Sequence, residues 1–106
     1  MKKILLVEDD IDIVKHLISF LENEGFFVYH TDGQTKAMDM IENQYFDLIL
    51  LDLGLKEGHG FSLYHQIKSY QDIPIIFLTA SNDEYSVVTG LNLGADDYIS
   101  KPFRPR

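Results

Sequence analysis

The segment at residues 47–53, DLILLDL, is the feature that most constrains the fold of this 106-residue chain. It places four consecutive aliphatic residues between two aspartates. A short, unbroken run of this kind is typical of a β-strand that is buried on both faces, as in a parallel sheet. Ligand sites of open α/β sheets lie at the carboxyl ends of their strands. Asp52 therefore marks a candidate site, although aspartate is also common in ordinary turns.

Four further segments have the length and composition of strands. They are residues 3–7 (KILLV), 26–31 (FFVYHT), 75–79 (IIFLT) and 97–100 (DYIS). Between the strands, apolar residues recur at the spacing of one helix face. The predicted helices cover residues 11–21, 37–43 and 61–68, and a fourth runs from Asn82 or Asp83 through Leu93. Asp9 or Asp10 can cap the first helix, and Gly25 can end it.

This alternation of strands and helices predicts an α/β fold with a parallel sheet and helices on both of its faces. The length suits one domain, and a content of 45% hydrophobic and 25% charged residues is ordinary for a soluble protein. The chain has no cysteine, which excludes disulfides and thiolate chemistry. No apolar run approaches the roughly 20 residues of a membrane span, and acidic residues follow the short basic start. We therefore expect a cytoplasmic protein that does not contact a membrane.

The net charge of −8 makes DNA binding by this domain itself unfavourable. If the protein acts on DNA, another domain must supply the contact. Acidic side chains can instead attract a divalent cation where they converge.

Polar residues stand at the carboxyl ends of four predicted strands. They are Glu8, Asp9, Asp10, Asp52, Thr79 and Lys101. If the first and third strands are neighbours, their carboxylates face each other and repel unless a cation joins them. Oxygen ligands with room for water suit Mg²⁺. A carboxylate beside a cation, a hydroxyl and a lysine resembles a phosphoryl-transfer site, in which an aspartate can be the nucleophile.

Each of these residues alone has a commoner explanation. Asp9 and Asp10 could only cap a helix, Thr79 could be an ordinary strand residue, and Lys101 could be a solvated turn residue. The four histidines show no zinc-binding spacing, and the glycines after Asp52 match no phosphate-binding loop. The argument therefore depends on the whole set.

Four motifs contain these residues in order: LLVEDD, LILLDLGL, FLTA and GADDYISKPF. Together they resemble the receiver domain of bacterial two-component response regulators, over essentially the whole chain. The sequence of the last motif, GADDYISKPF, is most similar to that of the OmpR/PhoB-type transcription factors. These proteins carry a winged-helix DNA-binding domain after the receiver. The resemblance implies a flavodoxin-like (CheY-like), doubly wound sheet of five parallel strands in the order 2-1-3-4-5.

The resemblance also implies roles for individual residues. Asp52 would be the phosphoacceptor, assisted by Thr79 and Lys101. The Mg²⁺ ligands would be Glu8, Asp9, Asp52 and the backbone carbonyl of Gly54. Thr79 and Tyr98 would change position when the domain is activated.

A sensor histidine kinase would supply the phosphoryl group, and phosphorylation would switch an attached DNA-binding domain through homodimerisation. Such a domain is a signalling switch that catalyses only its own phosphorylation and dephosphorylation, not a conventional enzyme.

The sequence departs from the receiver pattern at several positions. Lys56 replaces a common proline, His59 replaces a common Asp or Ser, and residues 85–94 lack the usual basic side chains. The chain ends in FRPR, where the resemblance implies a fifth helix. We therefore expect residues 1–106 to be a receiver truncated before that helix, and to dimerise only weakly on activation.

Three alternatives remain open. A Mg²⁺-dependent phosphatase with an aspartyl nucleophile would need a second aspartate at position 54, where this chain has Gly54. A flavodoxin-like cofactor binder would need a phosphate-binding loop after the first strand, where this loop is acidic. A receiver that stands alone, without a DNA-binding domain, is the third.

Overall fold

The computed structural model describes residues 2–52, 54, 60–79 and 97–100. Within these residues the strands are β1 (Lys3–Val7), β2 (Phe27–Thr31), β3 (Leu48–Asp52), β4 (Ile75–Thr79) and β5 (Asp97–Ser100). The helices are α1 (Ile11–Asn23), α2 (Gln34–Asn43) and α3 (Gly60–Tyr70). The helix predicted between β4 and β5 lies outside the described residues, as does the segment after β5.

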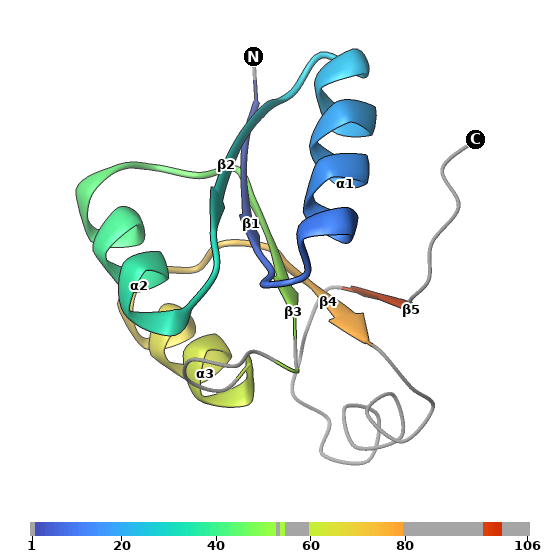
Figure 1. The fold of residues 1–106 in the computed structure, drawn as a ribbon. Helices are drawn as coiled ribbons and strands as arrows, with labels where there is room; N and C mark the ends of the chain where they lie inside the picture. The colour runs from blue at the N-terminus through green and yellow to red at the C-terminus, as the bar shows by residue number, and fades with distance from the viewer. Residues whose placement is uncertain (1, 53, 55–59, 80–96, 101–106) are drawn as a thin grey trace.

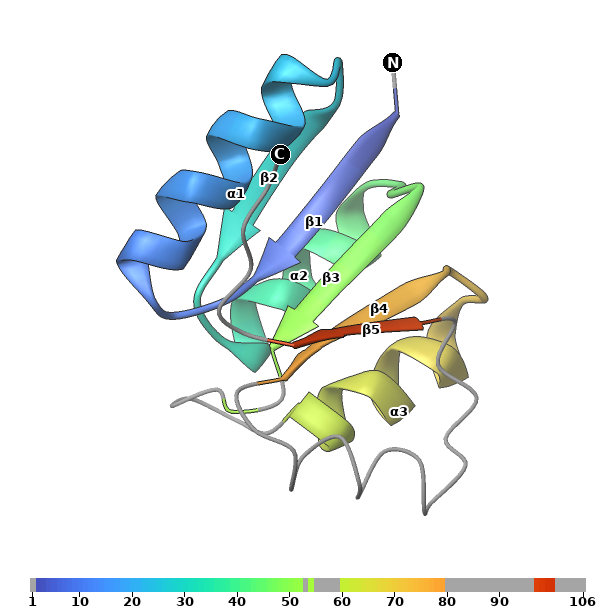
Figure 2. The same cartoon turned by 90° about the vertical axis from the view of Figure 1, so that its right-hand side faces the viewer.

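The strands form one sheet in the order β2-β1-β3-β4-β5, and every pair is parallel. Figure 1 shows α1 on one face of this sheet and α2 and α3 on the other. Figure 2 shows the arrows of β1, β2 and β3 side by side and pointing the same way. The predicted flavodoxin-like fold and its strand order are therefore confirmed.

Successive residues of the central strands pack on opposite faces of the sheet. In β1, Leu5 belongs to the core on the side of α2 and α3, whereas Leu6 belongs to the core on the side of α1. The first core also contains Val7, Ala37, Ile41, Ile49, Leu51, Leu63, Ile67 and Phe77. The second core contains Ile4, Val14, Leu17, Leu50 and Leu78. Each of these side chains larger than alanine stabilises the fold by about 1.5–3 kcal/mol when fully buried, so both faces of the sheet contribute.

The end of α1 explains why β2 starts one residue later than the sequence predicted. Gly25 adopts φ 94°, a left-handed conformation that glycine accepts without strain. The N–H of Gly25 donates to the carbonyl of Glu22, and the N–H of Phe26 donates to the carbonyl of Leu21. These two bonds form a Schellman motif, which satisfies carbonyls at the helix end. Phe26 is therefore part of the helix terminus, and the strand begins at Phe27.

Aromatic contacts anchor α3 to the sheet. The ring of Phe77 in β4 lies 5.9 Å from the ring of Phe61 and 5.3 Å from that of Tyr64, between centroids. Ile67, on the same face of α3, is fully buried. The predicted spacing of Phe61, Tyr64 and Ile67 along one helix face is thus confirmed.

A half-buried lysine, Lys3, joins several segments where β1 starts, at the amino-terminal edge of the sheet. Its backbone N–H donates to Asp47 Oδ2 at 2.7 Å, and its Nζ donates to Gln44 Oε1 at 2.8 Å. The same Nζ lies 5.1 Å from the ring centroid of Tyr29 and 5.4 Å from that of Phe46, within the range of cation–π attraction.

Among the described helices, none has both the length and the apolar character required to cross a membrane.

Candidate functional site

Asp52 is the last residue of β3, at the carboxyl edge of the sheet, as the sequence predicted. The residue is only 2% exposed. The N–H of Gly54 donates to Asp52 Oδ1 at 3.2 Å, so the turn after the strand helps to orient the carboxylate. A buried carboxylate is costly unless hydrogen bonds and charges of opposite sign compensate it.

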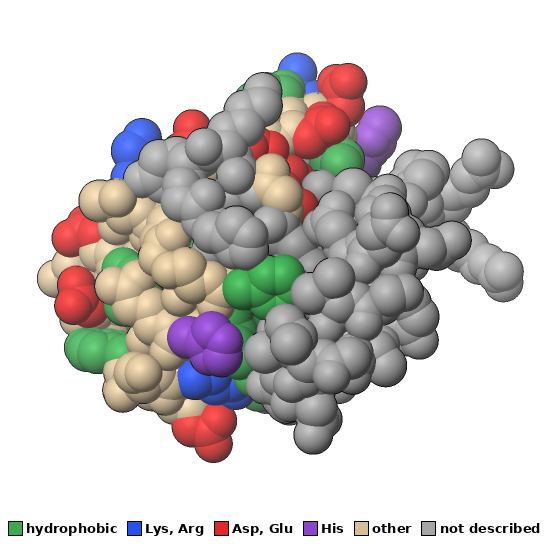
Figure 3. All heavy atoms as spheres, turned by 90° about the horizontal axis from the view of Figure 1, so that it is seen from below, with side chains coloured by type: hydrophobic (Ala, Val, Ile, Leu, Met, Phe, Trp, Pro, Cys, Tyr) green, Lys and Arg blue, Asp and Glu red, His purple; other side chains and the backbone are tan. Residues whose placement is uncertain are grey.

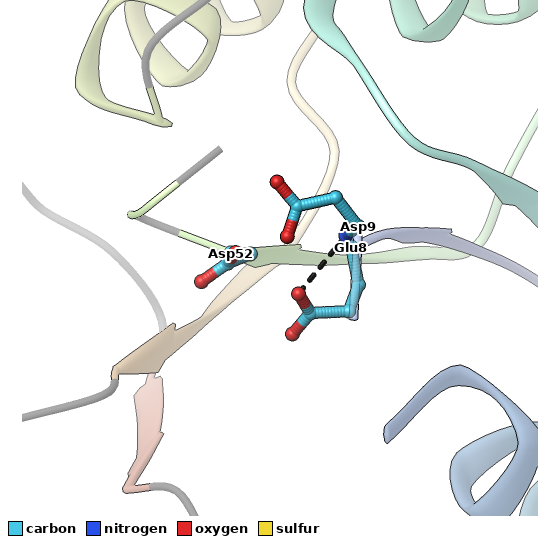
Figure 4. Close-up of side chains that lie close together, drawn as sticks. All are labelled: Glu8, Asp9 and Asp52. Atoms are coloured by element: carbon cyan, nitrogen blue, oxygen red, sulfur yellow. Dashed lines mark hydrogen bonds between the residues drawn. The ribbon is translucent and has the colours of Figure 1, made fainter. Parts of the chain in front are cut away.

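Glu8 follows β1 directly and is fully buried. Its backbone N–H donates to the carbonyl of Thr31 at 3.1 Å, which continues the pairing of β1 with β2 by one residue. Its Oε2 accepts the N–H of Asp9 at 3.0 Å and that of Asp10 at 3.1 Å. The loop after β1 therefore folds around the Glu8 carboxylate, and Figure 4 draws the bond from Asp9.

Asp9 and Asp10 have different positions, although the sequence treats them alike. Asp10 is exposed and is the N-cap of α1, because its Oδ1 accepts the N–H groups of Asp12 at 3.0 Å and Ile13 at 3.3 Å. Asp9 is half-buried and lies beside Glu8 and Asp52. Asp10 therefore caps the helix, whereas the side chain of Asp9 lies in the acidic group with Glu8 and Asp52.

Glu8, Asp9 and Asp52 bring one carboxylate oxygen each to positions that all lie within 4.8 Å of one another. Figure 4 shows the three side chains meeting where β1 and β3 end. The register explains this meeting, since Val7 of β1 pairs with Leu51 of β3. Figure 3, which looks at the end of the molecule where the strands stop, shows acidic side chains near the upper edge and others along the left and lower edges. Three carboxylates in so small a space repel unless a cation neutralises them.

The chemistry of these donors fits a hard divalent cation. All three ligands are carboxylate oxygens, and the group is partly exposed, so water could complete the coordination. Mg²⁺ is commonly bound by one or two carboxylates and several waters. The acidic pocket of Glu8, Asp9 and Asp52 is therefore able to bind a metal ion.

The other predicted site residues are placed only in part. Gly54 is an exposed turn residue, and Thr79 is the last residue of β4, whose Leu78 pairs with Asp52. The backbone of Tyr98 pairs with Phe77 in β5. Strand pairing thus puts Asp52 and Thr79 at the same edge of the sheet. Lys101 lies outside the described residues, and so do Lys56, His59 and residues 85–94.

Sequence reasoning missed one residue beside this site. The Nε2 atom of His30, in β2, lies 2.8 Å from the backbone carbonyl oxygen of Glu8. Two signals could have found it: His30 stands near the end of a predicted strand, and the strand order that the receiver resemblance implies places that strand next to the first one. The acidic loop follows the first strand, so the two strand ends are neighbours.

Known proteins resemble this chain in both sequence and fold. Residues 4–106 match the response regulator receiver domain family. The chain belongs to this family. The receiver is 41% identical over 104 residues to the regulatory protein VanRc of Enterococcus gallinarum, covering 98% of this chain and 45% of that protein. It is 37% identical to the response regulator SaeR of Staphylococcus aureus, covering 100% of this chain and 46% of that protein.

Among solved structures, a two-component response regulator from Clostridium difficile superimposes on this receiver with a TM-score of 0.89 at 33% identity. The match covers 98% of this chain and 86% of that one. The receiver spans about half the length of the curated relatives it matches. Membership of this family confirms the receiver domain that the four sequence motifs predicted.

Proposed function

We propose that this receiver accepts a phosphoryl group on Asp52 from a sensor histidine kinase. The observation that carries the proposal is the convergence of Glu8, Asp9 and Asp52 at the carboxyl edge of the sheet, with oxygens within 4.8 Å of one another. The ion would be Mg²⁺, held by these three side chains and the backbone carbonyl of Gly54. When bound, it would supply positive charge to the phosphoryl oxygens.

In this reaction a carboxylate oxygen of Asp52 attacks the phosphorus, and a new P–O bond forms as the P–N bond of the phosphohistidine breaks. The leaving imidazole takes up a proton, and Asp52 becomes an acyl phosphate. The bond from the N–H of Gly54 to Asp52 Oδ1 restricts the orientation of the nucleophile. Positioning of this kind accounts for much of the catalysis in phosphoryl transfer.

Thr79 and Lys101 would contact the phosphoryl group, and Thr79 and Tyr98 would change position on activation. The sequence motifs support these roles, and the place of Thr79 at the end of β4 is consistent with them. The domain would thus be a signalling switch that catalyses only its own phosphorylation and dephosphorylation.

The output would be control of transcription in the cytoplasm, through a C-terminal DNA-binding domain of the OmpR/PhoB type and a homodimer of the full-length protein. Three observations support this proposal: the spelling GADDYISKPF, the length of the relatives, and their names as regulators. Because the net charge of −8 makes DNA binding by the receiver itself unfavourable, the contact with DNA would come from that other domain.

Intact-mass spectrometry tests the phosphoacceptor. Incubation with acetyl phosphate and Mg²⁺ should add the mass of one phosphoryl group, and chelation of the metal should prevent the addition. Asp52→Asn should abolish it. Asp72→Asn is the matched control, because Asp72 is 99% exposed and lies at the far end of α3 from the site. Undiminished phosphorylation of Asp52→Asn would show that the assignment is wrong.

A further inference from the structure

We propose that His30 is a positioning residue for the acidic pocket, because it holds the peptide group that joins Glu8 to Asp9. The inference rests on the proposed function, since it assumes that Asp9 is a metal ligand. It concerns a residue that the receiver motifs do not include.

The contact has a defined direction. His30 Nε2 lies 2.8 Å from the carbonyl oxygen of Glu8, which is a short hydrogen bond. A carbonyl oxygen can only accept, so Nε2 must carry the hydrogen and donate it.

This bond holds the carbonyl oxygen of the peptide group between Glu8 and Asp9, and a second bond holds the N–H of the same group. The N–H of the same group belongs to Asp9 and donates to Glu8 Oε2 at 3.0 Å. Because a peptide group is planar and rigid, holding both its oxygen and its N–H restricts the orientation of the whole group. Together with the φ torsion of Asp9, that orientation determines the direction in which the Asp9 side chain leaves the backbone.

The donor stands on a rigid support. His30 lies in β2 opposite Leu6 of β1, and the next pair is Val7 with Thr31. The carbonyl of Thr31 accepts the N–H of Glu8 at 3.1 Å, so β2 also holds the peptide before Glu8. The end of β2 thus orients two successive peptide groups of the acidic loop. Groups that orient metal ligands in this way commonly alter metal affinity when they are removed.

Two substitutions separate the hydrogen bond from packing. His30→Leu removes the donor and puts an apolar side chain of similar bulk in its place. His30→Gln keeps an N–H donor at nearly the position of Nε2. His16→Leu is the matched control, because His16 is an exposed histidine on α1.

The first readout is amide hydrogen exchange of Asp9 and Asp10 in the metal-free domain, followed by NMR. We expect faster exchange in His30→Leu, near-normal exchange in His30→Gln and no change in His16→Leu. The second readout is Mg²⁺ titration, in which the His30→Leu variant should bind the ion about tenfold more weakly than the wild type. Loss of a group that orients a metal ligand typically weakens metal binding by about 10- to 100-fold, and we expect the lower end of this range. His30→Gln should recover most of this loss.

Unchanged exchange at Asp9 in His30→Leu would overturn the inference, and so would a defect that His30→Gln does not restore. If the wild-type domain bound no Mg²⁺, the proposed function would fail, but the exchange experiment in metal-free protein would still decide the role of His30. A further check needs no variant. At a pH where the ring is neutral, the long-range ¹H–¹⁵N spectrum of the wild-type protein should show hydrogen on Nε2, and hydrogen on Nδ1 would contradict the inference.

Discussion

A carboxylate oxygen of Asp9 lies within 4.8 Å of a carboxylate oxygen of Asp52, although the two residues stand at the ends of different strands. The closeness arises because β1 and β3 are neighbours in the sheet. Its energetic consequence depends on whether a cation is present, since the two charges repel without one.

Substitution of Asp9 should therefore have opposite effects on stability and on metal binding. Asp9→Asn removes one of three negative charges, so the metal-free domain should become more stable by about 1 kcal/mol, because Asp9 is only half-buried and water screens the repulsion. Mg²⁺ should bind more weakly. Thermal melts with and without Mg²⁺ measure both effects, and an unchanged Mg²⁺ titration would remove Asp9 from the site.

Substitution of Asp10 should affect stability but not metal binding. Asp10→Ala removes the N-cap of α1 and should destabilise the domain by about 1 kcal/mol, while Asp10→Asn should be nearly neutral because asparagine also caps helices. Both variants should titrate Mg²⁺ like the wild type. Urea unfolding measures the stability, and a large loss of Mg²⁺ affinity in Asp10→Asn would contradict this division between the two aspartates.

Lys3 should contribute to stability despite being charged and half-buried. Lys3→Met keeps the length of the side chain but loses the bond to Gln44 and the attraction to the rings of Tyr29 and Phe46, at a cost of about 1 kcal/mol. Lys2→Met is the control, since Lys2 is exposed. Equal urea midpoints for the two variants would show that these contacts contribute nothing.

Lys101 should matter after phosphorylation more than before it. On the receiver pattern it offers a positive charge to an oxyanion that exists only in the modified domain. Lys101→Ala should therefore leave the fold intact but separate phosphorylation from the conformational change. The NMR shift changes that beryllofluoride induces should be much smaller in this variant, and a wild-type pattern would contradict the proposed role.

Local patterns in the sequence indicated the helices and strands, including the buried strand that ends in Asp52. The run before Asp52 indicates a buried strand because a strand covered on both faces carries consecutive aliphatic residues, and a run this short is too brief for a buried helix. The glycine at position 25 indicates a helix end because glycine accepts a positive φ. The receiver motifs then named the acidic residues and the strand order, and the structure confirms the order.

The receiver resemblance implied different roles for the consecutive acidic residues, but only the tertiary structure showed where each of their side chains lies. Glu8, Asp9 and Asp10 are consecutive carboxylates, and local sequence favours a cap for either aspartate. The fold buries Glu8, directs Asp10 to the α1 terminus and leaves Asp9 beside Asp52. The contact of His30 with Glu8 and those of Lys3 with Tyr29 and Phe46 have the same origin. Each joins residues far apart in the chain, and such contacts depend on which strands are neighbours, a relationship that no local pattern of side chains encodes.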